Sequence, residues 1–242
     1  MRVLVISDVH SNLTALQAVL DDAGEVDITW SLGDIVGYGP EPNECIQTLQ
    51  SRPHVAVAGN HDWGVLGKLD LADFNEDARI ANLWNREQLT FESLAYLQAL
   101  PEKRIEGVCT LTHGSPRHPI WEYVISTSVA DANFAYFDTP ICLVGHTHVP
   151  ILFRQAAEDM ASQAIYLPEF QPVQLDDARY IINPGGVGQP RDGDPRAAYL
   201  LLDTEELIIE HRRVAYDIAA TQAKMRAVGL PRRNISRLEV GW

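Results

Sequence analysis

The sequence has few cysteines and no long hydrophobic run. Cys45, Cys109 and Cys142 are an odd number at wide spacings, which favours a reduced, cytoplasmic protein over a disulfide framework. The apolar start "MRVLVIS" reaches Asp8 after a few residues, which is too short for a signal-peptide core or a membrane span. We therefore expect neither a secreted disulfide-rich protein nor a membrane protein.

Positive charge is also scarce. The chain has 19 Lys and Arg against 33 Asp and Glu, a net charge of -14. Proteins that bind duplex nucleic acid need basic residues to displace counterions, so we expect no such partner. A chain of 242 residues with 46% hydrophobic and 21% charged residues is typical of one globular domain, which we place at 1–242. The sequence carries no sign of its oligomeric state.

The first third of the chain alternates apolar runs with helical periodicity. Residues 2–7 form an almost continuous apolar run, typical of a buried parallel strand, and apolar residues then recur at helical spacing over 13–20. The unit recurs at 27–34 with a helix candidate at 41–50, and "HVAVAGNHD" begins a third. This pattern predicts consecutive βαβ units on a parallel sheet.

The rest of the chain predicts helices followed by strands. We expect a helical insertion over about 63–100, with Ile80 and Leu83 among its apolar positions and Pro101 after its end. Strand-like runs that are mostly too close together for intervening helices follow, and a helix candidate lies at 214–228. The expected fold is α/β: a four-layer α/β/β/α sandwich of two mixed sheets flanked by helices.

Five polar motifs lie where predicted strands end: "SDVHSN", "LGDIVGYG", "GNHD", "THGSP" and "GHTHVP". In open α/β sheets, ligands gather outside the carboxyl ends of the strands, so these distant segments can converge. The candidate site residues in the motifs are Asp8, His10, Asp34, Asn60, His61, Asp62, His113, His146 and His148.

Each motif alone also fits a structural role. Asp-x-His is common at helix starts and His113 alone would fit a core histidine, whereas His-x-His directs alternate side chains of an extended segment to one side. Together the motifs indicate a site, because most of them follow an apolar strand and precede a turn with glycine, which lets the backbone approach closely.

The residue types select the metal. Carboxylates, one amide oxygen and imidazoles, without thiolates, suit Mn, Fe, Co, Ni or Zn better than a cysteine-rich zinc site or a calcium loop. About seven such groups are too many for one ion. They suit two divalent ions that clamp both oxygens of a displacement at phosphorus.

The order of the motifs resembles that of the calcineurin-like metallophosphoesterase superfamily: Asp-x-His, Gly-Asp, Gly-Asn-His-Asp, His and Gly-His-x-His. The small bacterial phosphodiesterases of that group are the most similar. The motifs span residues 8–148, and "INPGGVGQPRDGDPRAAYLLLD" resembles a closing segment of the same subgroup. Relatives often have Asn-Pro-Gly-Ser there, whereas this chain has Gly186 in place of the serine, so we expect no serine contact to substrate.

The resemblance implies a dinuclear centre and a mechanism. Asp34 would bridge two divalent metal ions, of which Mn is our first choice, and a metal-bridging hydroxide would attack phosphorus in line. The implied ligands are Asp8, His10 and His148 for the first metal, and Asn60, His113 and His146 for the second.

Two further roles concern the substrate. His61 resembles the family histidine that faces the leaving oxygen, where as a cation it would stabilise charge or donate a proton. Asp62 would either raise the pKa of His61 or cap the following helix. Arg191 and Arg117, in loops near the motifs, are candidates for bidentate contacts to a second substrate group, or are solvated loop arginines.

The expected function is hydrolysis of a small phosphoester, in the first place a diester. The alternatives are a phosphomonoesterase, a protein phosphatase or a dinucleoside polyphosphate hydrolase on the same site, and a noncatalytic metal-binding scaffold, which the presence of His61 disfavours. A nucleotide-binding regulatory domain is set aside, because "GDIVGYGP" and "NPGGVGQP" match neither the P-loop nor the dinucleotide pattern.

Overall fold

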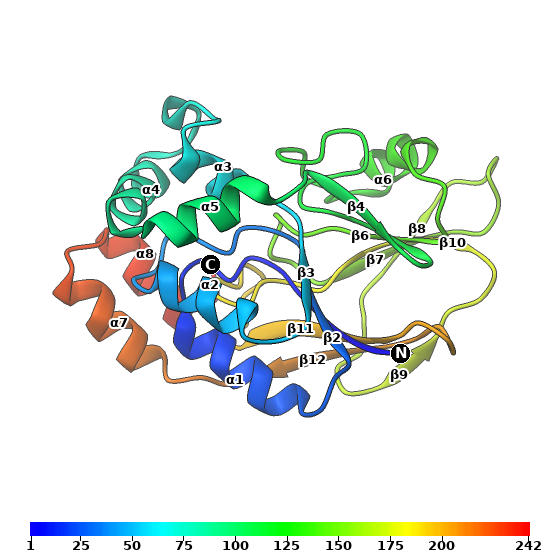
Figure 1. The fold of residues 1–242 in the computed structure, drawn as a ribbon. Coiled ribbons are helices and arrows are strands. Elements are labelled where there is room, and N and C mark those ends of the chain that lie inside the picture. Colours follow the sequence, from blue (N-terminus) through cyan, green and yellow to red (C-terminus); the bar gives the residue numbers. More distant parts are fainter.

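Two six-stranded sheets face each other in the computed structural model, which describes residues 1–242. Helices cover the outer side of both sheets, with α6 over one sheet and α1 and α2 over the other (Figure 1). The predicted α/β/β/α sandwich of two mixed sheets is thus confirmed.

The first sheet has the order β3-β2-β1-β11-β12-β9. The first three strands along the chain pair in parallel, as the βαβ pattern predicts, and the others are antiparallel. Its strands are β1 (Arg2–Ile6), β2 (Ile28–Ser31), β3 (His54–Ala56), β9 (Pro172–Gln174), β11 (Ala197–Asp203) and β12 (Ile208–Val214).

The second sheet has the order β4-β5-β6-β10-β7-β8. Its central strands β5, β6 and β10 are parallel, and antiparallel strands complete both edges. The bounds are β4 (Lys103–Glu106), β5 (Cys109–Thr112), β6 (Ile141–Leu143), β7 (Ile151–Gln155), β8 (Gln163–Ile165) and β10 (Arg179–Asn183).

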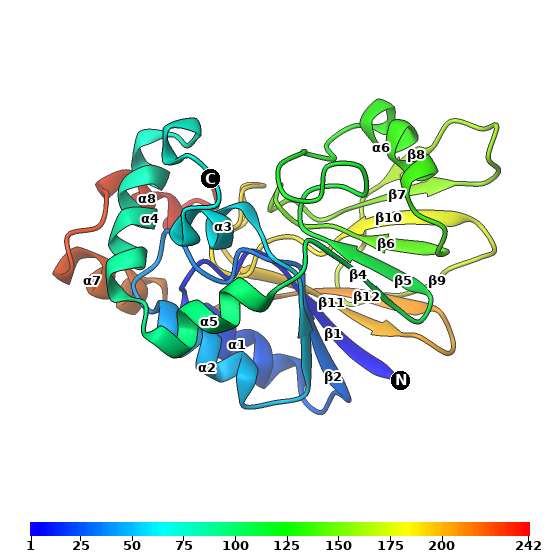
Figure 2. The ribbon, with the colours of Figure 1, turned by 45° about the horizontal axis from the view of Figure 1, so that its top comes forward.

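A group of helices lies beyond one end of the two sheets (Figure 2). It contains the helices of the predicted insertion and those of the C-terminal segment, which the sequence separates by more than 100 residues. The helices of the whole chain are α1 (Leu13–Ala23), α2 (Pro42–Gln50), α3 (Asn60–Leu66), η1 (Leu71–Asp73), α4 (Glu76–Gln88), α5 (Phe91–Ala99), α6 (Thr127–Asn133), η2 (Phe134–Tyr136), α7 (Ile218–Ala227), α8 (Arg232–Ser236) and η3 (Arg237–Glu239).

The core is layered because strand side chains alternate between two buried faces. On β1, Val3 and Val5 pack between the two sheets, whereas Leu4 and Ile6 pack outward against α1 and α2. A third cluster joins the second sheet to α6, and a fourth packs α4 against α7, α8 and η3.

The buried face of α4 differs from the expectation. Ile80 and Leu83 are 38% and 36% exposed, and the helix instead buries Asn82 and Asn85 together with two alanines. These asparagines are buried because they hydrogen-bond to the site: Asn85 accepts from Ser11 Oγ and from the backbone N–H of Gly37. Strands β4, β8 and β9 and the short helices α6 and α8 were not predicted, since short segments carry little periodicity.

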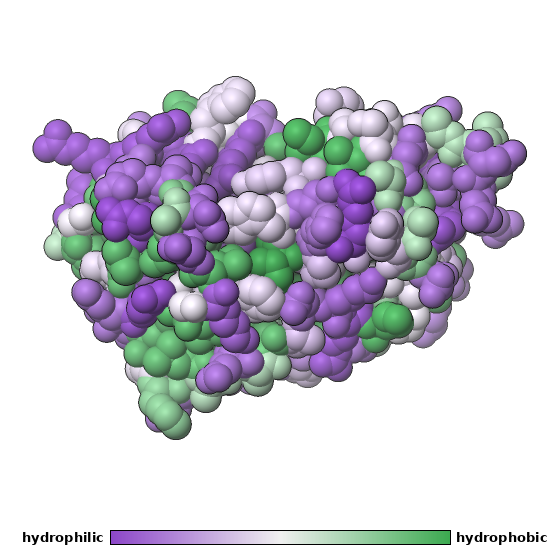
Figure 3. Space-filling view, turned by 90° about the horizontal axis from the view of Figure 1, so that it is seen from above, coloured by the Kyte–Doolittle hydropathy of each residue, from purple (hydrophilic) through white to green (hydrophobic).

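No helix of the chain combines the length and apolar character needed to cross a membrane. One face of the molecule mixes hydrophilic and hydrophobic residues, with hydrophilic ones gathered over the helical part on the left (Figure 3).

Leu200→Ala tests the layer between the sheets. Leu200 is fully buried in that layer, so we expect the free energy of unfolding to fall by about 2 to 5 kcal/mol in urea denaturation. Leu83→Ala on the half-exposed face of α4 is the matched control, with an expected loss below about 1 kcal/mol. Equal losses in the two variants would contradict the layered core.

Candidate metal centre

All five polar motifs converge at one end of the two sheets. They follow the parallel strands β1, β2 and β3 of the first sheet and β5 and β6 of the second. The carboxylate and imidazole candidates form buried groups whose donor atoms lie within 4.8 Å of one another, and Oδ1 of Asn60 lies 3.1 Å from Nε2 of His113. The structure thus brings together all seven metal ligands that the sequence and the resemblance suggested.

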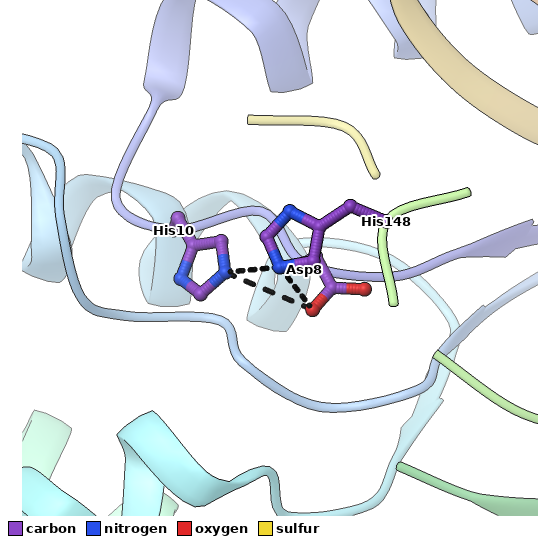
Figure 4. A group of neighbouring side chains, drawn as sticks. All are labelled: Asp8, His10 and His148. Carbon is purple, nitrogen blue, oxygen red and sulfur yellow. Dashed lines mark hydrogen bonds and ion pairs between the residues drawn. The ribbon is translucent and has the colours of Figure 1, made fainter. Parts of the chain in front are cut away.

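Asp8, His10 and His148 form the first group (Figure 4). Oδ1 of Asp8 lies 3.2 Å from Nε2 of His148 and 3.7 Å from Nε2 of His10, and the two ring nitrogens are 3.2 Å apart. The other nitrogen of each ring donates to a carbonyl oxygen, of Val36 for His10 and of Gln189 for His148. Both Nε2 lone pairs therefore point at the same spot.

Asn60, His113 and His146 lie in the second group. Nε2 of His113 is 3.1 Å from Oδ1 of Asn60 and 3.1 Å from Nδ1 of His146. Backbone carbonyls again hold the far ring nitrogens, with Leu32 at 2.8 Å from His113 Nδ1 and Trp121 at 3.2 Å from His146 Nε2. Each imidazole is thereby oriented to offer a lone pair to a metal.

Asp34 lies between the two groups. Its Oδ2 is 3.7 Å from Nε2 of His10 and 3.3 Å from Nε2 of His113, and its Oδ1 accepts the backbone N–H of His61 at 2.8 Å. One carboxylate oxygen thus faces ligands of both groups, which is the position that a bridging ligand needs.

The donor set fits divalent metal ions. Oδ1 of Asp8 and Oδ2 of Asp34 are buried without a hydrogen-bond donor, although burying an uncompensated carboxylate oxygen is costly. A cation placed between the imidazole lone pairs and these carboxylate oxygens would compensate both. Nitrogen and oxygen donors without sulfur agree with the transition-metal choice made from the sequence.

The ligands sit on strained backbone. Positive φ angles are uncommon outside glycine and cost about 1 to 3 kcal/mol each. Five of the nine non-glycine residues with positive φ are candidate ligands: Asp8 (56°), His10 (49°), Asp34 (53°), His146 (66°) and His148 (59°). Because the strain is concentrated on the candidate ligands, we infer that the placement of the ligands, rather than stability, determines the backbone conformation of these loops.

Gly59 shows why the "GNHD" motif begins with glycine. A Cβ atom at this position would lie 2.1 Å from Oδ1 of Asp34, so any side chain would displace that carboxylate. The close approach brings Asn60 and Asp34, which follow different strands, into one site.

His61 faces the pocket as a neutral ring. Its Nδ1 accepts a hydrogen bond from Nδ2 of Asn82 at 2.9 Å, which leaves the proton on Nε2. Burial lowers the pKa of His61 to about 4, against the attraction of Asp34, and Arg191 adds to the lowering. The expected cation is thus replaced by a neutral N–H donor, and the residue that orients it is Asn82, which the sequence analysis missed.

Asp62 supports the backbone rather than His61. Its carboxylate accepts the backbone N–H groups of Gly59 (2.9 Å), Asp34 (2.9 Å) and Val36 (3.2 Å), and no hydrogen bond joins it to His61. Of the two expected roles, the structure shows the one at the start of helix α3, where Asp62 accepts the backbone N–H of the N-cap residue Gly59.

The two arginine candidates, Arg191 and Arg117, lie in different environments. Arg191 lines a pocket of about 330 Å³ above the metal centre, whereas Arg117 lies outside it and pairs through Nε with both carboxylate oxygens of Glu122, at 3.0 and 2.9 Å. The expectation for Arg117 as a substrate contact is therefore wrong, because Glu122 uses its donors. Trp63, next to the motif, carries Lys68 over its ring and also lies outside the pocket.

The pocket also contains residues that no sequence motif indicated. They come from the helical insertion, from the loop after β5 and from the C-terminal segment: Asp73, Phe74, Asn75, Asp77, Trp121, Tyr123, Arg233, Asn234 and Arg237. Tyr38, within the "LGDIVGYG" motif, also lines the pocket but was not singled out from the sequence. Exposed aromatic residues in a loop were the one available signal, since Trp121 and Tyr123 are 40% and 44% exposed.

Comparison with known proteins decides the family. A family model described as "calcineurin-like phosphoesterase superfamily domain" matches residues 1–207 of the chain. The chain belongs to this superfamily. The calcineurin-like chain is 42% identical to the uncharacterized protein MJ0912 of Methanocaldococcus jannaschii, over 99% of this chain and 98% of that protein.

Solved structures agree with the assignment. A metallophosphoesterase from Sphaerobacter thermophilus is 50% identical, with a TM-score of 0.92 over 100% of this chain and 99% of that one. A hypothetical protein, PH1004, from Pyrococcus horikoshii OT3 is 20% identical with a TM-score of 0.80, over 100% and 98% of the two chains, and shares the fold.

In the metal-free site, His113 holds a proton that a metal must displace. Burial lowers its pKa, but the nearby carboxylate of Asp34 outweighs burial and raises the pKa to about 9. Metal binding near neutral pH therefore releases this proton, and the affinity for metal should rise with pH up to about 9.

Asp34→Asn tests the bridging position. We expect isothermal titration of Mn²⁺ into metal-stripped protein to show two ions per chain in the wild type, and Asn at position 34 to lose one ion or weaken binding about 10- to 100-fold. Asp73→Asn, a pocket carboxylate outside the ligand groups, is the control and should bind like the wild type. Unchanged stoichiometry and affinity in Asp34→Asn would exclude the bridging role.

Proposed function

We propose that the chain hydrolyses a phosphodiester of a small organic substrate at a dinuclear metal centre. The observation that carries the proposal is the position of Asp34 between two buried ligand groups, both of which border the same pocket. Membership of the superfamily supports phosphoester hydrolysis as the reaction class. The geometry of the site supports the details of the proposal.

The residues set the charge of the centre. Asp8, His10, Asp34, Asn60, His113, His146 and His148 would hold two divalent ions, which would supply hydroxide and attract phosphate. Only Asp8 and Asp34 bring negative charge, since Asn60 is neutral and each histidine offers a lone pair. A local excess of positive charge follows, which explains how a protein with a net charge of -14 can bind an anionic substrate.

His61 donates a hydrogen bond to the leaving oxygen and stabilises the negative charge that develops there. Asn82 holds its Nδ1, so Nε2–H is free to donate. Tyr38 and Phe74 pack against its ring, with centroids 4.5 and 5.2 Å away, which fixes the ring plane. A positioned donor of this kind contributes about 10²- to 10³-fold to the rate.

The aromatic side of the pocket favours a diester over a monoester. Tyr123 stacks on His146 with centroids 3.9 Å apart, and Phe74 contacts Trp121 edge to face at 5.0 Å. These rings extend apolar surface away from the second ligand group. A diester carries an organic substituent on each side of phosphorus, so one can leave past His61 while the other lies on these rings.

A metal-by-substrate panel tests the function. Metal-stripped protein is reloaded with Mn, Fe, Co, Ni or Zn and assayed with bis(p-nitrophenyl) phosphate, p-nitrophenyl phosphate, a phosphotyrosine peptide, and cyclic and linear dinucleotides. We expect the highest kcat/KM with a diester. Turnover only of the monoester or the peptide would move the assignment to a phosphatase, and no turnover with any metal would refute the hydrolase.

His61→Ala tests the hydrogen bond to the leaving oxygen. We expect a loss in kcat of about 10²-fold or more for aryl diesters with poor leaving groups, a smaller loss for p-nitrophenolate, and an unchanged metal content. His118→Ala, an exposed histidine outside the pocket, is the control and should keep the wild-type dependence on leaving-group pKa. Equal losses for all leaving groups would contradict the donor role.

A further inference from the structure

Three arginines line the pocket and have no acidic partner. Arg191 comes from the loop after β10, Arg233 from α8 and Arg237 from η3. None of them takes part in an ion pair, although acidic residues outnumber basic ones in the chain. The ion pairs of Lys and Arg side chains use Arg79, Arg104, Arg117, Arg154, Arg196, Arg212, Arg213 and Lys224 instead.

Arg191 stands next to the metal centre. Its Nη2 donates to Oε1 of Gln189 at 3.0 Å and to Oη of Tyr38 at 3.3 Å, and its Nε is buried without an acceptor. Tyr38 in turn contacts the rings of His10 and His61, with centroids 4.7 and 4.5 Å away. A buried guanidinium N–H without an acceptor is costly, and an anion in the pocket would satisfy it.

Arg237 is half-buried, and its Nε donates to the carbonyl oxygen of Trp242. Burial, together with the positive charges of Arg191 and Arg233, lowers its pKa to about 10. Asp73 and Asp77 also line the pocket, and Asp77 partly offsets this effect, yet neither carboxylate lies within ion-pair distance of the three guanidinium groups. Three mutually repelling cations facing one pocket are a cost that a bound anion removes.

The arginines are held in place from both sides. Asp192 pairs with the buried Arg213, and the backbone N–H of Gly193 donates to the carbonyl of Gly241 at 2.9 Å, which ties the Arg191 loop to the C-terminal segment. Asn234 donates through Nδ2 to the carbonyl of Asp77 at 3.1 Å and fixes α8 on α4. The backbone segments that carry the three arginines are therefore held in place by the fold, and the side chain of Arg233 is exposed.

We propose that Arg191, Arg233 and Arg237 form a second anion subsite, which binds a negatively charged group of the substrate outside its scissile phosphoester. The proposal rests on the proposed function for the position of that scissile group. The substrate class is a phosphoester with a second phosphate or comparable anion, held by charge-assisted, bidentate contacts. The subsite selects such substrates over simple diesters.

Non-hydrolysable ligands test the subsite without turnover. Alkane-1,ω-diyl bisphosphonates from propane to octane are compared with monophosphonates of the same chain length, by isothermal titration into Mn²⁺-loaded protein. We expect the second phosphonate to tighten binding about tenfold or more for at least one chain length, since charge-assisted contacts add to affinity. Added salt should reduce this advantage.

Substitutions of the arginines test whether they cause the tighter binding of bisphosphonates than of monophosphonates, called here the bisphosphonate advantage. Arg233→Gln and Arg237→Gln should each reduce the bisphosphonate advantage to below about threefold, and Arg237→Lys should retain part of it because the charge remains. Arg232→Gln, the exposed neighbour outside this pocket, is the matched control and should keep the full advantage. Arg233 is exposed, so its variant remains informative if Arg237→Gln folds poorly.

The outcomes separate the two proposals. No advantage at any chain length, or an advantage that persists in Arg233→Gln and Arg237→Gln, overturns the subsite. An arginine-dependent advantage in a protein that hydrolyses no phosphoester supports the subsite and refutes the hydrolase.

Discussion

Two buried carboxylate oxygens without hydrogen-bond donors are the constraint on which the rest of the site depends. Oδ1 of Asp8 and Oδ2 of Asp34 face imidazole nitrogens whose far sides are already held by backbone carbonyls. An uncompensated buried carboxylate costs several kcal/mol, so a chain that retains two of them needs cations at these positions. The arrangement explains the ligand types, the orientation of every ring and the position of Asp34.

The surrounding structure exists to keep these oxygens in place. Five of the seven candidate ligands have positive φ angles, which hydrophobic packing of the two sheets and hydrogen bonds from three backbone N–H groups to Asp62 stabilise. Asn82 and Asn85 turn helix α4 toward the site, at the cost of exposing Ile80 and Leu83. The side chains that surround the ligands therefore serve to orient the ligands.

Charge is distributed unevenly between the surface and the pocket. The chain is strongly acidic as a whole, yet its pocket combines a metal centre with three arginines that lack acidic partners. Long-range repulsion of anions by the acidic surface is largely screened by salt, whereas contacts inside the pocket are screened less. Binding at such a site is decided by local groups, and the aromatic and arginine surfaces contribute different parts of the proposed selectivity.

The sequence by itself determined most of the strands, the order of the polar motifs and the metal-ligand types, because apolar runs and strand-end residues are local patterns. Only the tertiary structure decided how these residues are used. It divided the ligands into two groups around Asp34, assigned Asp62 to the backbone, and separated Arg191 from Arg117. It also brought Arg233 and Arg237 beside Arg191, since that meeting depends on packing of α8 and η3 against α4, and no local pattern records contacts between segments so far apart.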